Sequence, residues 1–106
     1  RALSVVAEAG LPAVVSSALD TSVGLAMGVA LAASLPELDF DCGLGTASLL
    51  AADVTRDPLR PQGGSLPVGR VTVDSAFLDA HAAPAERGEW WLARLERCHA
   101  VLAASA

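Results

Sequence analysis

The stretch PAVVSSALDTSVGLAMG, Pro12 to Gly28, decides the fold class. It begins with an apolar, β-branched run that is typical of a buried strand, and this run stops at two adjacent serines. Small apolar residues follow and favour a helix. A strand that leads directly into a helix is the building unit of an α/β protein. The stretch therefore predicts a strand over 11–15 and a helix that starts at 20–22 and runs to about Leu35.

A second stretch, LDFDCGLGTASLLAADV from Leu38 to Val54, repeats this scheme with a short strand, a glycine turn and a helix that starts near Thr46. Two consecutive strand–helix units favour a parallel barrel or a doubly wound sheet. In such folds the chemistry collects at the carboxyl ends of the strands, and Ser16 and Ser17 stand at one of these ends.

The flanking segments are predicted with less regular structure. Residues 1–9 resemble the end of a helix with Gly10 as its C-cap, and prolines and glycines mark a turn-rich excursion over 55–69. A short strand is expected over 69–74, a helical turn or two over 75–83, and a last helix with Pro84 at its first position. That last helix carries an apolar stripe made of Trp91, Leu95, Cys98 and Leu102.

Composition limits the possible functions. Hydrophobic residues make up 53% of the 106 residues and charged ones 18%, which is apolar for so short a chain and predicts cover from a larger protein. The net charge is −5, and all basic residues are arginines without a basic stripe, so a nucleic-acid partner is not expected. The apolar run 23–35 is shorter than the roughly 20 residues of a bilayer crossing, and the balance is that of an acidic cytoplasmic protein.

Several motifs allow more than one interpretation. The glycine turn CGLGTAS is a poor dinucleotide fingerprint, because Ser48 replaces its third glycine. Ser16 and Ser17 lack the glycines of a nucleophile elbow, so they either hold a substrate carboxylate or cap the next helix. Asp39 and Asp41 share one strand face, which suits a metal or proton transfer but suits solvated acids at a strand entrance better.

Longer motifs carry a family resemblance. From Val14 to Val54 the chain reads VVSSALDTSVGLAMGVALAASLPELDFDCGLGTASLLAADV, and looser likeness continues through PLRPQGGSLPVGRVTVD and WWLARLERCHAVLA. These stretches resemble the last third of actinobacterial o-succinylbenzoate synthases, which are members of the enolase superfamily. The resemblance covers essentially the whole chain.

The resemblance implies a modified (β/α)₇β barrel with a capping domain. Residues 1–54 would supply the last two strand–helix units of the barrel, and residues 55–106 an extension that packs on the barrel or the cap. It implies a lyase that removes water from a cyclohexadiene carboxylate in menaquinone biosynthesis, with a divalent cation, usually Mg²⁺, and lysines on earlier strands. Because this chain starts after the sixth strand and contains no lysine, it would hold no catalytic residue or metal ligand, and alone it should be inactive.

The resemblance also implies substrate-binding roles. Ser16 and Ser17 would end the seventh strand and hold a carboxylate of the small-molecule substrate, while Asp20 would order the joint. Gly43, Leu44 and Gly45 would end the eighth strand, with their backbone amides and that of Thr46 directed into the mouth of the pocket.

Two other functions stay open. An N-succinylamino acid racemase or a dipeptide epimerase shares the superfamily fold and the enolate-forming step. A small non-catalytic domain that folds alone and binds partners through its apolar helix belongs to another class.

Overall fold

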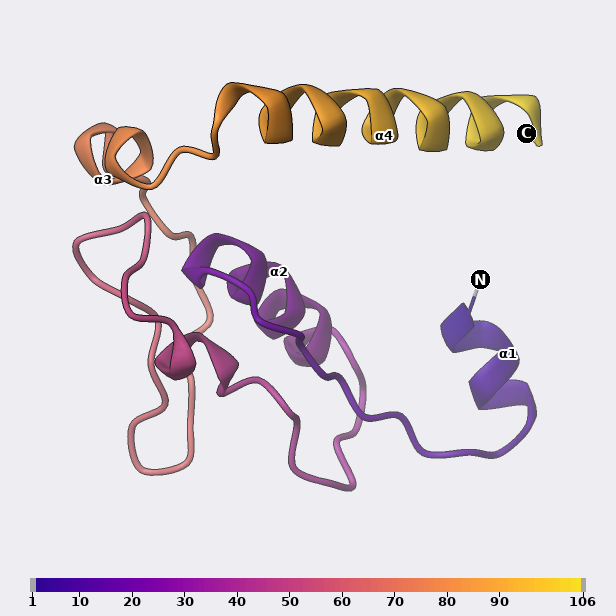
Figure 1. Cartoon of the computed structure of the whole chain (residues 1–106). Helices are drawn as coiled ribbons and strands as arrows, with labels where there is room; N and C mark the ends of the chain where they lie inside the picture. Colours follow the sequence, from indigo (N-terminus) through magenta and orange to yellow (C-terminus); the bar gives the residue numbers. More distant parts are fainter. Residues whose placement is uncertain (1, 106) are drawn as a thin grey trace.

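The computed structural model describes residues 2–105, in which helices are joined by long irregular segments (Figure 1). The elements are α1 (Ala2–Glu8), α2 (Ser22–Ala33), the 3₁₀ helix η1 (Thr46–Leu49), α3 (Ser75–Ala80) and α4 (Ala85–Ala104).

The predicted strands are not formed within residues 2–105. Segments 11–15 and 38–42 meet at one parallel bridge, between Ser16 and Gly43, and 69–74 has no strand partner there. At the bridge, Gly43 N donates to Val15 O and Ser17 N donates to Gly43 O, both at 2.9 Å. The parallel pairing of the two units is thus present, but the described residues form no barrel. An isolated pair of strands is marginally stable at best, and three or more are usually needed for an independent sheet, so a single bridge between two segments fits the lack of further strands among the described residues.

The helices follow the predictions more closely. Gly10 ends the first helical segment with φ +66°, as a C-cap glycine does. α2 stops at Ala33, two residues before the predicted end. The helix expected from Thr46 is a single 3₁₀ turn, and Pro84 lies at the N-cap of α4 instead of its first helical position.

A small core lies between α2 and the segments that carry the glycine turn. Its buried members are Val15, Leu25, Val29, Ala32, Leu44 and Ala47. A Cβ on Gly28 would lie 2.9 Å from Cδ2 of Leu44, so the absence of a side chain lets α2 approach this segment closely. Gly28 therefore serves the close packing of α2 on the core.

The start of α2 is capped from a distance. Thr21 is the N-cap residue but makes no side-chain cap bond. Instead Ser22 N donates to both Asp53 carboxylate oxygens, at 3.2 and 3.0 Å, and Ser22 Oγ donates to Asp53 Oδ2 at 2.6 Å. Leu59 N donates to Ser22 Oγ at 2.7 Å. This partly buried cluster joins both predicted strand–helix units and the start of the extension.

Much apolar surface stays open. The accessible area is 8173 Å², against about 5,500 Å² for a compact protein of this mass. The radius of gyration is 16.5 Å, against about 13 Å for a compact domain of this length. Figure 1 shows α4 as a straight rod at one edge of the molecule, apart from α2. Trp90 and Trp91 are 44% and 55% exposed, so neither ring lies in the core.

Candidate functional site

The serine pair and the glycine turn lie together. The Ser16–Gly43 bridge brings the two segments side by side, and Ser17 Oγ lies 3.2 Å from Gly43 O and 2.8 Å from Thr46 Oγ1. Residues 16–17 and 43–46, which are far apart in sequence, therefore form one continuous surface.

Side chains alternate between two faces where the segments meet. Val15 and Leu44 are buried against α2, beside Gly28. Ser16 follows Val15 in extended backbone, so its side chain points away from α2, and it is exposed. A Cβ on Gly43 would lie 2.8 Å from Ser16 Oγ, so a glycine here leaves room for the hydroxyl.

The backbone donors of this surface divide into used and free groups. Gly43 N, Leu44 N and Ser17 N donate to Val15 O, Cys42 O and Gly43 O, respectively. Within residues 2–105, the amides without an acceptor are Ser16 N, Gly45 N and Thr46 N. Val15 and Ser17 bond to Gly43, so Ser16 N faces the other edge of its segment. The available donors beside the glycine turn are therefore the amides of Gly45 and Thr46 and the Ser16 hydroxyl, which suit a carboxylate because it has only acceptor atoms.

Asp20 lies apart from this donor set. Its Cβ is 3.1 Å from where a Cβ on Gly24 would stand, at the first turn of α2. The cap that orders this joint comes from Asp53, a residue whose role the sequence did not suggest. A role for Asp20 in the joint stays a prediction.

The larger of two hollows adjoins the candidate surface. It has a volume of about 950 Å³ and reaches from Leu44 and Gly45 to residues 61–68 and to the end of α2. Asp39 and Asp41 line it as well. Among the described residues no three His, Cys, Asp or Glu side chains converge, so this part of the chain does not fit a metal centre by itself.

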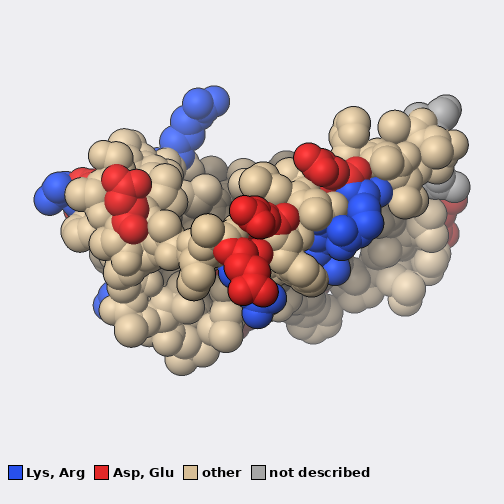
Figure 2. Space-filling model, turned by 45° about the horizontal axis from the view of Figure 1, so that its top comes forward, with Lys and Arg blue, Asp and Glu red and all other residues tan. Residues whose placement is uncertain are grey.

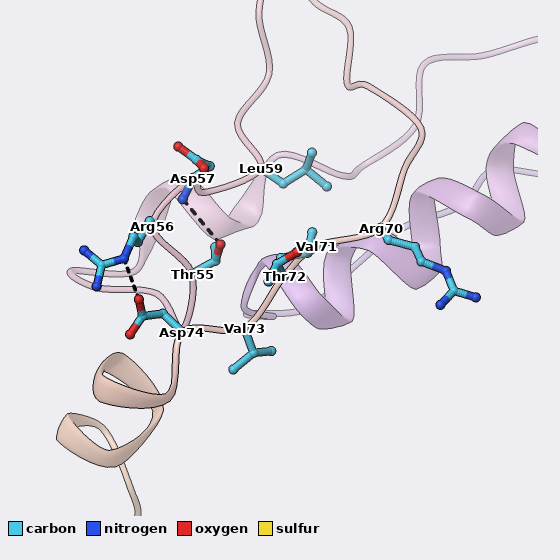
Figure 3. Close-up of a pocket in the computed structure, with 9 residues that line it drawn as sticks. All are labelled: Thr55, Arg56, Asp57, Leu59, Arg70, Val71, Thr72, Val73 and Asp74. Atoms are coloured by element: carbon cyan, nitrogen blue, oxygen red, sulfur yellow. Dashed lines mark hydrogen bonds and ion pairs between the residues drawn. The ribbon is translucent and has the colours of Figure 1, made fainter.

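The second hollow, of about 400 Å³, lies between residues 55–59 and 70–74 (Figure 3). Arg56 Nε pairs with Asp74 Oδ2 at 2.5 Å, whereas the Arg70 side chain points the other way. Because the two guanidinium groups do not converge, this hollow is not an anion site.

Asp74 has a structural role at that hollow. Desolvation of its carboxyl acts to raise the pKa of Asp74, but hydrogen bonds from Phe77 N and Ala76 N and the charge of Arg56 outweigh it, so the pKa lies below its usual range. Those two amides belong to the first turn of α3, so Asp74 is its N-cap.

Charged side chains of both signs lie on the surface of the chain. Figure 2 shows acidic and basic groups interspersed on a mostly uncharged face, without a basic stripe. Across residues 2–105, no helix combines the length and the apolar character that a membrane crossing requires.

Several known proteins are similar to this chain in sequence. No family model matches the chain. The o-succinylbenzoate synthase of Thermobifida fusca is 55% identical over 101 residues, which are 94% of this chain and 31% of the relative. The enzyme of the same name from Mycobacterium leprae is 49% identical over 100 residues, 94% of this chain and 30% of the relative. The enzyme of the same name from Mycobacterium tuberculosis H37Rv is 48% identical over 103 residues, which are 97% of this chain and 31% of the relative.

The chain thus spans about 30% of the length of the curated relatives it matches. The matched region is their C-terminal part. The resemblance read from its serine and glycine motifs is confirmed, and the chain is a homologue of the C-terminal part of o-succinylbenzoate synthases.

Proposed function

We propose that this chain is the C-terminal part of an o-succinylbenzoate synthase, a carbon–oxygen lyase of menaquinone biosynthesis. The reaction is the elimination of water from 2-succinyl-6-hydroxy-2,4-cyclohexadiene-1-carboxylate. The observation that carries the proposal is 48–55% identity to synthases over nearly the whole chain. In this proposal, residues 1–54 are the last two units of the barrel and residues 55–106 are the extension.

The chemical problem is the removal of a weakly acidic proton next to a carboxylate. A divalent cation, usually Mg²⁺, stabilises the resulting enediolate when it is bound. We assign the metal ligands and the lysines to the preceding part of the protein, because this chain has no lysine and its described residues no metal cluster.

The part of this chain is to hold and orient a carboxylate of the substrate. The Ser16 hydroxyl and the amides of Gly45 and Thr46 are free donors on the surface of the paired segments. Hydrogen bonds to a charged acceptor contribute about 1.5–3 kcal/mol each, so two or three of them fix the orientation of a small anion.

The open surface supports the proposed packing of residues 55–106 on the rest of the enzyme. The accessible area exceeds that of a compact protein by roughly 2,700 Å²; buried against an equal area of a partner, this would make about 5,400 Å² in total, at the upper end of obligate interfaces. The large apolar side chains of α4, such as Leu95 and Leu102, belong to this excess. A domain that folds alone would bury them, which argues against the non-catalytic alternative.

A hybrid enzyme tests the proposal. Residues 1–106 are joined to the preceding two thirds of the Thermobifida fusca synthase, and dehydration is measured in the presence of Mg²⁺. We expect turnover by the hybrid and none by the 106 residues alone. A folded hybrid that lacks dehydratase activity, or a chain that is active alone, contradicts the proposal. Faster racemisation of an N-succinylamino acid than dehydration reassigns the reaction within the superfamily.

Substitutions tie the activity to the candidate site. Ser16→Ala removes the free hydroxyl and should raise KM about tenfold, because one charge-assisted hydrogen bond is lost. The matched control is Ser34→Ala, since Ser34 is exposed at the other end of α2 and bonds only to Leu31 O. An unchanged KM in the Ser16 variant argues against a binding role for the serine pair.

A further inference from the structure

We propose that Ser17 and Thr46 are positioning residues of the carboxylate site and that, of the serine pair, only Ser16 gives its hydroxyl to the ligand. The inference rests on the carboxylate site of the proposed function and assigns different roles to the residues of that site.

The hydrogen-bond directions carry the argument. Thr46 Oγ1 donates its proton to Ala18 O. The bond of 2.8 Å between Ser17 Oγ and Thr46 Oγ1 therefore requires Ser17 as the donor, because a hydroxyl has one proton. The contact of 3.2 Å from Ser17 Oγ to Gly43 O shares that same proton. We name this relay, from Ser17 through Thr46 to Ala18, the hydroxyl clasp.

The clasp leaves Ser17 with nothing to donate. Its hydroxyl proton lies within the clasp and its backbone N–H is bonded to Gly43 O. A carboxylate near Ser17 Oγ would meet only lone pairs, which repel it. Ser16 differs, because its side chain is exposed on the opposite face and its hydroxyl has no partner among residues 2–105.

The clasp has a consequence for the site. Apart from it, two backbone hydrogen bonds join the segments at the bridge. The clasp adds a connection from the end of the first segment to Thr46, whose amide is one of the free donors. It therefore fixes the separation between the Ser16 hydroxyl and the amides of Gly45 and Thr46, which a bound carboxylate has to match.

A double-mutant cycle in the hybrid enzyme tests the clasp. Ser17→Ala and Thr46→Val should each raise KM several-fold with a smaller effect on kcat. The double variant should resemble the single ones instead of multiplying their effects, because both substitutions break one relay. Thr46→Ser keeps the hydroxyl and should restore KM. When Ser16→Ala and Thr46→Val are combined, the increase in KM should be closer to the product of the two single increases, since Ser16 contacts the ligand directly.

The result that overturns the clasp is a Ser17→Ala effect equal to that of Ser16→Ala, together with a silent Thr46→Val. A second measurement does not depend on turnover. In the hybrid enzyme, Ser17→Ala and Thr46→Val should accelerate amide hydrogen exchange at Gly43, again without additivity. An inactive wild-type hybrid refutes the proposed function alone, whereas additive exchange rates refute the clasp alone.

Discussion

Replacing Ser22 by alanine should destabilise the core around α2 more than any other single loss of a hydroxyl in this chain. Ser22 is fully buried, and its Oγ both donates to Asp53 Oδ2 at 2.6 Å and accepts from Leu59 N at 2.7 Å. The substitution therefore removes a hydrogen bond to a charged group and leaves a half-buried amide without its acceptor.

The magnitude follows from these two losses. A hydrogen bond to a charged group contributes about 1.5–3 kcal/mol, and an unsatisfied buried amide costs about 1–3 kcal/mol. Asp53 and Leu59 are only partly buried, so water compensates for some of the loss. We expect a decrease in the free energy of unfolding of about 3 kcal/mol, a large fraction of the total for a small chain.

Amide hydrogen exchange at Leu25 and Val29 is the suitable assay, because both residues are buried in the core beside α2. A loss of about 3 kcal/mol corresponds to exchange roughly a hundredfold faster. Ser34→Ala is the control, since it removes a hydroxyl from an exposed site at the end of the same helix. Ser22→Thr keeps the hydroxyl and should recover part of the protection. Equal exchange rates in the Ser22→Ala and Ser34→Ala variants would refute this reasoning.

Four further substitutions probe other parts of the structure. Gly88→Ala in α4 meets no atom within 4 Å and should gain up to about 1 kcal/mol of helix stability, seen by circular dichroism. Gly28→Ala meets a core leucine methyl at 2.9 Å, so thermal unfolding should show a smaller gain or a loss. Gly43→Ala places a methyl group 2.8 Å from Ser16 Oγ, so in the hybrid it should raise KM, and an unchanged KM would contradict the assigned geometry. Folding lowers the pKa of Asp74, so its cap on α3 is complete above about pH 3.8 and is lost as the pH falls through the pKa of the folded state. The amide chemical shifts of α3 should follow this titration, and Asp74→Asn should abolish it.

The sequence predicted those features that depend on local residue types. The small apolar residues before Leu35, the glycine at position 10 and the amphipathic stripe near Trp91 indicated helices, which the structure contains. The motifs also indicated that the serine pair and the glycine turn belong to one surface, because strand ends of neighbouring units meet at one edge.

Features that depend on distant partners were not predictable. The strand at 11–15 has the right residues, but a ladder forms only where other strands supply hydrogen bonds. The cap of α2 comes from Asp53, which lies 31 positions after Ser22. Asp53 follows two alanines, and this sequence context does not predict a capping role. The contacts of the Thr46 hydroxyl, with Ser17 and Ala18, are also made across 29 and 28 positions, and no local pattern predicts them.

The long-range cap of α2 has a consequence for biosynthesis. During synthesis Ser22 is made 31 residues before Asp53 and 37 residues before Leu59, so the first turn of α2 lacks its cap until both have been added. At bacterial elongation rates of about 5–20 residues per second, the 37 residues between Ser22 and Leu59 take roughly two to seven seconds. We therefore expect α2 to become stable only after Leu59 has been added to the chain.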